Sequence, residues 1–441
     1  MSRPPDVRTP PETAPATPLG PGIPWRLIRA TGTDRRLLLR SLITIVGRGL
    51  SKFAILIFLI LATRLLSRTE YGVYSYVLVL ANTFGILADP QISLVAGREV
   101  AAGRRDPAAA FWDAFPIVLA AGTAAALALI AFGLIDRGPG MTPSELLVAG
   151  AVVVFNRLVG LGTDMLRSLG RFGLEAGIET AGTILLVAAA SIVASRGLGV
   201  TAVLGAFLLH GVLTTIVCQL ALRRDVGRPR RPTRAWRAMF RTGIRLSLAA
   251  SATAVATRAP LIVLGTSASA VAVASYSAGL RFADAAYLLA LTAGQALLPS
   301  ISSLVGTDRR RALRLSRRVA GGGFLLGVVI AAGTAPFGRA ITTTIFGPGY
   351  ASAGELMSTL MLAVPFMGVF WIFWFSLFAH GGERGVLAVG GAGAVVSLVL
   401  SIVVIPSGGA LAAAWIYVAV LGLLAGGTFA ALERRSGALA P

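Results

Sequence analysis

The sequence has little charge, almost no lysine, one cysteine and two histidines. Only 13% of its 441 residues are charged, and Lys52 is the single lysine among 40 basic residues. The lone Cys218 permits no intramolecular disulfide, and the two histidines fall in different predicted helices without the Cys/His cluster that binds zinc. We therefore expect no disulfide, no metal site and no cofactor.

The sequence also lacks the short motifs of common catalytic sites. It contains no GxSxG nucleophile elbow, no HExxH zinc motif, no phosphate-binding P-loop and no dinucleotide-binding GxGxxG that follows a strand. The sequence therefore contains none of these motifs for ATP-driven transport or for hydrolytic catalysis. We predict that the protein is not an enzyme and has no catalytic residues.

What the sequence has instead is apolar residues, which make up 55% of the chain. About 240 such residues would supply roughly twelve membrane spans of about 20 residues each. The chain is therefore predicted to be an all-α, polytopic membrane protein. The apolar runs place spans at 41–62, 73–96, 111–135, 145–166, 176–195, 199–222, 243–265, 276–300, 318–337, 355–379, 385–406 and 409–431.

The basic residues lie mostly on one side of these spans. With the N-terminus in the cytoplasm, about 30 of the 40 basic residues fall in cytoplasmic segments and five in outer loops. Basic loops are retained in the cytoplasm and face anionic membrane lipids, so the net charge of +21 needs no nucleic-acid partner. We expect a multi-pass protein of the bacterial inner (plasma) membrane with both termini in the cytoplasm.

The longest basic loop divides the spans into two sets of six. The predicted organisation is a disordered, proline-rich cytoplasmic tail with a basic interfacial segment (1–40), an N-terminal six-helix lobe (41–222), a basic cytoplasmic linker (223–242), a C-terminal six-helix lobe (243–431) and a cytoplasmic tail (432–441). Shifting residues 71–106 by 202 positions superimposes the second span on the eighth without a gap. This shift predicts a parallel, pseudo-two-fold repeat of the lobes, whose interface is where such transporters bind substrate.

Several charged residues fall inside the predicted spans, where ionisable groups are costly and commonly mark a transport pathway. The five cations are Arg48, Lys52, Arg157, Arg258 and Arg281. The three acids are Asp89, Asp164 and Asp284. If all eight share one cavity, two positive charges remain uncompensated and the cavity favours an anion. The alternative is structural: Arg281 with Asp284, and Arg157 with Asp164, form neutral pairs that fasten helices together.

Three segments resemble the polysaccharide flippases of the Wzx type. LLSRTEYGVYS at 65–75 resembles their first outer turn, LADPQISLVAGRE at 87–99 the end of their second helix, and FGPGY at 346–350 the outer loop before the tenth helix. The similarity in layout covers nearly all of 41–431. These flippases belong to the superfamily of multidrug, oligosaccharidyl-lipid and polysaccharide exporters, and the resemblance implies two six-helix lobes around a central cavity.

The resemblance also implies a cargo, an undecaprenyl-pyrophosphate-linked oligosaccharide moved from the inner to the outer leaflet by alternating access for cell-surface polysaccharide such as lipopolysaccharide or exopolysaccharide. The cations would hold the pyrophosphate, because arginine forks match phosphate oxygens. Asp89, Asp164 or Asp284 would exchange H⁺ or Na⁺, and a polysaccharide polymerase or glycosyltransferases would be partners. In this chain Asp89-Pro90-Gln91 stands where family members commonly have an acid followed by glycine.

Three other functions stay open. A cation-coupled exporter of drugs or small metabolites has the same fold but predicts a cavity dominated by acids. Lipid II flippases are related and usually carry two further helices. A membrane glycosyltransferase or glycan ligase would need catalytic carboxylates and a sizeable outer loop, and the predicted outer loops are about ten residues long.

Overall fold

The structure, a computed structural model, describes residues 54–55, 57–136, 138, 140–233 and 236–437. Every regular element in this part of the chain is helical. After helical residues 57–65, the elements are α2 (Arg68–Leu87), α3 (Ile92–Ala101), α4 (Pro107–Ile135), α5 (Pro143–Ser168), α6 (Phe172–Ser195), α7 (Gly199–Val226), α8 (Trp236–Ser267), α9 (Ala270–Thr307), α10 (Arg309–Thr334), η2 (Ala335–Phe337), α11 (Gly338–Phe346), η3 (Pro348–Tyr350), α12 (Ala353–Met361), α13 (Val364–Ala379) and α14 (Glu383–Gly437).

The helices account for the predicted spans. Eight stretches of the described chain are long and apolar enough to cross a membrane alone, and two more spans are bent pairs, α2 with α3 at 55° and α12 with α13 at 42°. The long α14 contains the non-helical Gly409, which divides it where the sequence predicts the loop between the last two spans. Residues 57–65 end the first span, most of which lies outside the described residues. The all-α, polytopic fold is thus confirmed.

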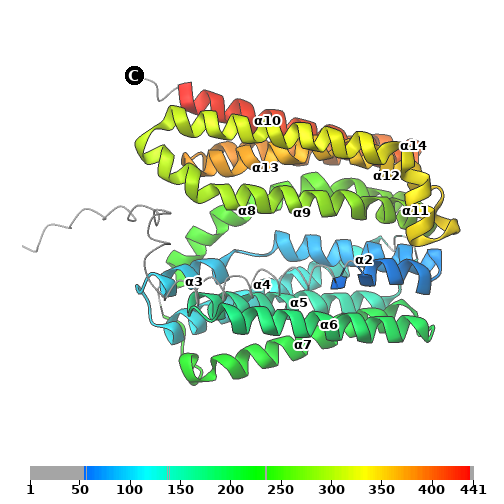
Figure 1. The fold of residues 1–441 in the computed structure, drawn as a ribbon. Coiled ribbons are helices and arrows are strands. Elements are labelled where there is room, and N and C mark those ends of the chain that lie inside the picture. Colours follow the sequence, from blue (N-terminus) through cyan, green and yellow to red (C-terminus); the bar gives the residue numbers. More distant parts are fainter. Residues whose placement is uncertain (1–53, 56, 137, 139, 234–235, 438–441) are drawn as a thin grey trace, which may run out of the picture.

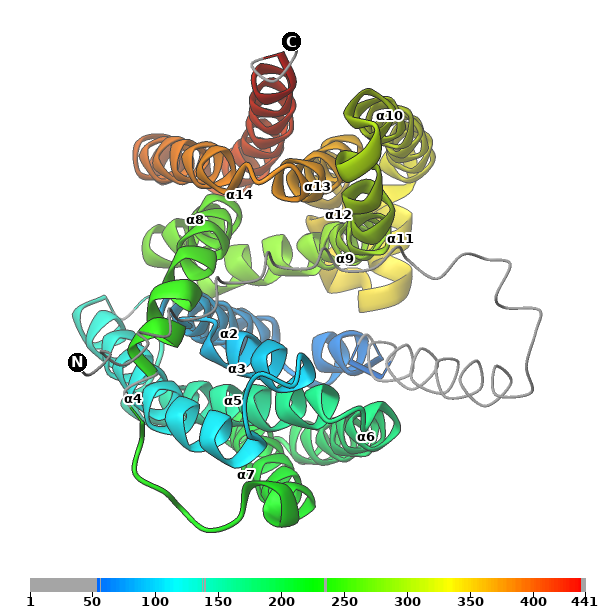
Figure 2. The same ribbon diagram turned by 90° about the vertical axis from the view of Figure 1, so that its left-hand side faces the viewer.

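The helices form two groups that follow the order of the chain. Helices α2 to α7 lie together in one half of the molecule and α8 to α14 in the other (Figure 1). Figure 2, which looks along the helices, shows the same separation. Within the first lobe α4 packs on α5 and α5 on α7, and within the second α14 packs on α8 and α13 on α9. Between the lobes, α2 packs against both α8 and α9.

The two lobes repeat in the predicted register. Ser67 caps the N-terminus of α2, and Ser269, 202 positions later, caps α9. Asp106 caps α4, and Asp308, again 202 positions later, caps α10. Capping residues sit at fixed places in a helix, since their side chains accept hydrogen bonds from the first turn. The coincidence of two caps therefore supports the repeat more strongly than the sequence identities do.

All arginine-rich connections lie at one end of the molecule, which we call the basic end. The chain crosses from end to end with each span, so the connections α3–α4, α5–α6, α7–α8, α9–α10 and α13–α14 share the left side of Figure 1 with the C-terminus. The opposite end, called the far end, holds the start of α2, the connection α8–α9 and the short helix α11. The one-sided distribution of arginine in the sequence is therefore a distribution in space.

Within the predicted linker 223–242, residues 223–226 continue α7 and residues 236–242 begin α8. The described residues between the two helices are 227–233. Arginine is a good helix former, and its long side chain carries its charge away from the helix, so arginine-rich ends can extend both helices beyond the apolar core. Met239, in the second turn of α8, belongs to a hydrophobic cluster of the N-terminal lobe.

A buried carboxylate fastens this connection to the N-terminal lobe. The side chain of Asp113 on α4 is 1% exposed and accepts hydrogen bonds from Arg105 and from the main-chain N–H of Thr233. The hydroxyl of Thr233 also donates to it, at 2.6 Å. Both carboxylate oxygens are thus engaged by groups from outside α4. The connection between α7 and α8 is therefore fixed to the first lobe through Thr233.

At the far end, arginines from before and within α2 reach the second lobe. Arg64 donates to the main-chain carbonyls of Thr344 and Ile345, at 2.6 and 2.9 Å. These carbonyls lie in the last turn of α11, where helical carbonyls have no partner within the helix. Arg68 lies 5.7 Å from the ring centre of Tyr350, and burial raises the pKa of that phenol, which stays neutral. These contacts join the start of α2 to the second lobe at the far end.

Two glycines let the lobes touch at opposite ends. A Cβ on Gly72 in α2 would lie 2.0 Å from the carbonyl oxygen of Ala270, at the far end. A Cβ on Gly243 in α8 would lie 2.0 Å from the carbonyl oxygen of Pro90, toward the basic end. Both obstacles are main-chain atoms that cannot turn away. Any larger residue at either position must separate the lobes there.

We therefore expect Gly72→Val and Gly243→Val to open opposite ends of the molecule. Spin labels at Thr69 and Glu355, both exposed at the far end, allow the separation to be measured by double electron–electron resonance. Gly72→Val should lengthen this distance, whereas Gly243→Val should not. Gly205→Val is the control, because a Cβ at Gly205 meets nothing within 4 Å. Unchanged distances in Gly72→Val would contradict the close approach.

We also expect Asp113→Ala to destabilise the protein, by about 3 kcal/mol, because the largely buried Arg105 loses its buried carboxylate partner and keeps only the longer, more exposed pair with Glu99, at 3.5 Å. Thermal unfolding of the purified protein measures the loss. Arg230→Ala is the matched control: its pair with Asp106 is 3.7 Å long and both side chains are more than half exposed, so its loss should cost less than about 1 kcal/mol. Equal effects of the two changes would refute the fastening role of Asp113.

Candidate functional site

A cavity of about 430 Å³ lies between the two lobes. Its walls come from Ile55, Phe58 and Leu59, from α2, α5, α6 and α7 of the first lobe, and from α8 and α9 of the second. Most of the lining side chains are apolar, among them Phe58 and Leu186. Three are charged, namely Arg258, Arg281 and Asp284. An apolar cavity with a few converging polar groups is the usual form of a ligand site.

The three charged residues come from two helices of the second lobe. Arg258 lies on α8, two residues before Pro260, and Arg281 and Asp284 lie three residues apart on α9. Arg258 Nη2 is 3.2 Å from Asp284 Oδ1, and Arg281 Nη1 is 3.8 Å from Asp284 Oδ2. The side chains are 30%, 18% and 24% exposed respectively, and that surface faces the cavity. Two guanidinium groups thus share one carboxylate, which leaves one net positive charge.

The opposite wall is uncharged at the equivalent positions of the repeat. Val79 and Asn82 of α2 lie 202 positions before Arg281 and Asp284, and both line the same cavity. Asn156 of α5 adds a second amide. In the described part of the chain, the charge of the central cavity therefore belongs to the second lobe, while the first lobe supplies neutral hydrogen-bonding groups.

A smaller cavity of about 220 Å³ lies within the first lobe and shares Asn156 with the central one. It is lined by Asp89, Arg157 and Asp164, among others. Arg157 Nη1 donates to Asp89 Oδ2 at 2.5 Å. Asp89 also accepts from the main-chain N–H and the side-chain amide of Gln91, at 2.8 and 3.0 Å. The break between α2 and α3 thus brings a carboxylate to α5.

The suggested pairing of Arg157 with Asp164 is wrong. Asp164 instead accepts from Arg167 at 2.8 Å, and Arg167 also donates to Glu175 at 2.7 Å. Seven residues separate Arg157 from Asp164, a distance of about 10 Å along a helix, whereas Arg167 is only three residues away. Asp89, from the break between α2 and α3, is therefore the partner of Arg157, and Asp164 on the same helix is not.

The predicted site residues therefore divide into three sets. Arg258, Arg281 and Asp284 meet in the central cavity. Arg157, Asp89 and Asp164 line the neighbouring cavity of the first lobe. Arg48 and Lys52 lie outside the described residues.

The polar residues that the sequence analysis missed are uncharged. Asn82, Thr83 and Asn156 line the central cavity but carry no charge, and such residues are not unusual in membrane spans. One signal could have found Asn82, because the shift of 202 positions aligns it with Asp284. Among the described residues, no three His, Cys, Asp or Glu side chains come together as a metal ion would require.

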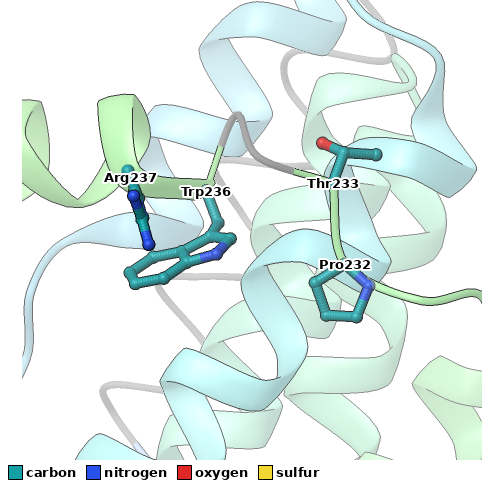
Figure 3. Close-up of a pocket in the computed structure, with 4 residues that line it drawn as sticks. All are labelled: Pro232, Thr233, Trp236 and Arg237. Carbon is teal, nitrogen blue, oxygen red and sulfur yellow. The ribbon is translucent and has the colours of Figure 1, made fainter.

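A third cavity, of about 380 Å³, lies where α7 is joined to α8 (Figure 3). It is lined by Pro232, Thr233, Trp236 and Arg237. The guanidinium of Arg237 lies 5.7 Å from the centre of the Trp236 ring. Trp236 is 22 residues before Arg258 on the same helix, or about 33 Å away. This third cavity is thus a feature of the basic end, and a tryptophan with an arginine there is typical of the lipid headgroup boundary.

Comparisons with known proteins agree with this architecture. The model of a family described as "Polysaccharide biosynthesis protein" matches residues 38–305, which is more than half of the chain. No curated protein sequence matches the chain.

Three solved structures are similar in fold. They are the lipid II flippase MurJ in an inward closed conformation (TM-score 0.70, 13% identity, 90% of this chain and 87% of that one), an inward-facing multidrug resistance transporter of the MATE family (TM-score 0.64, 15% identity, 88% and 94%) and a transporter of the same MOP superfamily from Pyrococcus furiosus (TM-score 0.63, 16% identity, 94% and 98%). At these identities the likeness shows the fold alone.

The polarity of the central cavity can be tested by thiol labelling of Asn82→Cys in a Cys218→Ala background. We expect a negatively charged thiosulfonate reagent to react about fivefold faster than a positively charged one, because the cavity carries net positive charge. Arg281→Gln in the same background should remove this preference. Leu127→Cys, whose native side chain is 62% exposed on the outside of α4, is the control that water-borne reagents should label poorly. Equal rates for both reagents at Asn82→Cys would contradict a cationic cavity.

Proposed function

Because the chain belongs to the polysaccharide biosynthesis protein family, we propose that it moves a polyprenyl-pyrophosphate-linked oligosaccharide from the cytoplasmic to the outer leaflet. As part of this proposal, the protein is a multi-pass membrane flippase or exporter, like the MOP-superfamily proteins whose fold it shares. The movement would proceed by alternating access of the central cavity and would serve the synthesis of cell-surface polysaccharide.

The observation that carries this proposal is the pair of arginines in the central cavity. Arg258 and Arg281 present two guanidinium groups to a space that holds a single acid, Asp284. Guanidinium groups bind phosphate oxygens through paired hydrogen bonds, and the apolar surroundings strengthen the attraction. The amides of Asn82 and Asn156 face them and can bond to phosphate or sugar oxygens. An anionic headgroup with an attached sugar fits both walls.

The arrangement of charge also supports a direction of transport. The arginine-rich connections gather at the basic end, and such segments are retained in the cytoplasm. We therefore place the basic end and both termini in the cytoplasm, in a bacterial inner membrane. In this orientation the contacts of Arg64 and Arg68 with the second lobe lie on the outer side, and a lipid-linked substrate would enter from the cytoplasmic leaflet.

Coupling and partners remain predictions of the same hypothesis. Asp89, Asp164 and Asp284 are the carboxylates proposed to exchange H⁺ or Na⁺, and each faces an arginine in this structure. Opening of such a pair would free a carboxylate for a proton. Glycosyltransferases or a polysaccharide polymerase would supply the substrate or consume the product at the two membrane faces.

The runner-up, an exporter of cationic drugs or small metabolites, is less consistent with the cavity. Such a cargo would require an excess of acids, and the described lining has two arginines for one aspartate. A lipid II flippase would carry the same pyrophosphate group, so the cavity alone does not separate it from the proposed cargo. Chemical identification of the glycan that accumulates in depleted cells distinguishes the two cargoes.

The test is leaflet-resolved labelling of polyprenyl-pyrophosphate-linked glycan in cells depleted of the protein. We expect the glycan to build up in the inner leaflet, and wild-type protein to clear it. A chain carrying Arg258→Gln and Arg281→Gln should clear it at least about tenfold more slowly, because the headgroup loses both charged hydrogen-bonding partners. Arg317→Gln is the matched control, since that arginine is half exposed and pairs with Glu433 away from the cavity.

Each outcome decides a separate part of the proposal, provided that the variants reach the membrane in equal amounts. No accumulation on depletion would reject the flippase function and favour the small-molecule exporter. Accumulation of lipid II in place of a surface-polysaccharide precursor would change the cargo. Clearance by the double variant at the wild-type rate would keep the function but reduce both arginines to helix-packing residues.

A further inference from the structure

Asp284 lies between the two arginines that would hold the substrate. Each of its oxygens faces a different guanidinium, Oδ1 facing Arg258 and Oδ2 facing Arg281. It therefore occupies the position that an incoming phosphate would need. A carboxylate and a phosphate oxygen compete for the same donors.

The contacts of Asp284 are the loosest among the ion pairs of the two cavities. Its distances of 3.2 and 3.8 Å exceed the 2.7–2.9 Å that is typical of a charge-assisted hydrogen bond. Asp89, in the smaller cavity, is held by Arg157 at 2.5 Å and by two donors of Gln91. Among the described residues, no main-chain N–H or hydroxyl donates to Asp284. Little therefore prevents it from moving away from the arginines.

The fold itself does not demand an acid at this position. The equivalent residue of the first lobe is Asn82, which lines the same cavity with a neutral amide of nearly the same size. An asparagine at 284 would therefore fit the packing of the repeat. What the carboxylate adds is charge.

That charge has opposite effects in the empty and in the occupied cavity. Without a ligand, two arginines in an apolar region would repel each other, and Asp284 offsets one of them. A pyrophosphate in a lipid-linked sugar has two phosphate groups, each ionised once at neutral pH. Its two charges match the arginines alone, and a carboxylate left between them would repel the ligand.

From this geometry we propose that Asp284 is an internal counter-anion, which the phosphates of the substrate displace from Arg258 and Arg281. The inference rests on the proposed function, since it names how the same cavity accepts and releases its headgroup. Displacement weakens binding, and the return of the carboxylate to the arginines helps to expel the bound headgroup. A flippase benefits from both, because a substrate held too tightly is not released.

The proposal is tested by the affinity of the purified full-length chain for inorganic pyrophosphate in lipid nanodiscs, measured by isothermal titration calorimetry. We expect Asp284→Asn to bind pyrophosphate about tenfold or more tightly than wild type, because a competing charge a few ångströms from the ligand is removed. Asp284→Glu, which keeps the charge, should stay near the wild-type affinity. Asp225→Asn controls for net charge, since Asp225 pairs with Arg171 at 3.0 Å outside both cavities.

A second arm uses farnesyl pyrophosphate in the same nanodiscs, which shows whether the lipid-linked form follows the same rule as the free anion. In cells, Asp284→Asn should clear lipid-linked glycan more slowly than wild type in spite of its tighter binding. Tighter binding together with slower clearance would support an exchanging counter-anion and would not follow from a packing role.

Two results would overturn the inference, and they are distinguishable. If wild type binds pyrophosphate but Asp284→Asn binds it equally or more weakly, with an unchanged melting temperature, the counter-anion role fails and the proposed function stands. If neither wild type nor any variant binds pyrophosphate or farnesyl pyrophosphate, both the counter-anion role and the phosphate-binding cavity fail.

Discussion

The structure depends on one constraint, which is that a charge in hydrocarbon needs a partner. In the described spans, each cavity holds an arginine that faces an acid from outside its own helix. Arg157 on α5 meets Asp89 beside α2, and Arg258 on α8 meets Asp284 on α9. The first pair joins segments that are 68 positions apart, and the second joins two consecutive helices. The need to neutralise charge thus helps to determine which helices pack together, and the two cavities lie where the pairs are.

The same constraint explains how the two repeats differ. The repeat register places Thr292 and Ala293 opposite Pro90 and Gln91, and α9 is continuous there, while α2 and α3 are separated by a 55° bend. Pro90 lacks an N–H and disfavours a helical residue before it, and Gln91 adopts a positive φ of 53°. The bend brings Asp89 to Arg157, whereas Arg281 and Asp284 reach the central cavity from the continuous α9. The two equivalent spans therefore differ in role. The first pairs its carboxylate with an arginine of α5, and the second places its charged residues in the central cavity.

The sequence predicted the spans and identified Arg258, Arg281 and Asp284 as intramembrane charges, because hydrophobic length and intramembrane charge are local signals. Which of the eight charged residues share a cavity could not be predicted, and among the described ones these three line the central cavity. The break between α2 and α3 was not predicted. The hydrophobic pattern of a span is the same whether its helix is continuous or broken. Asp89-Pro90-Gln91 therefore indicated a departure from the family pattern and not a break in the helix. The partner of Arg157 was missed for a related reason, since periodicity ranks residues on one helix and gives no distance to another.

The uneven division of charge between the lobes bears on how a flippase with this cavity can work. Among the described residues, the cavity charges stand on α8 and α9, while α2 and α5 face them with the amides of Asn82 and Asn156. A headgroup bound by ionic contacts to one lobe and by neutral hydrogen bonds to the other keeps its stronger contacts when the lobes separate. The weaker contacts break first, because a neutral hydrogen bond is worth less than a charge-assisted one. The anion would therefore stay with the second lobe, and the first lobe would move past it. A strictly symmetric cavity would instead share the headgroup equally and oppose the separation of either end.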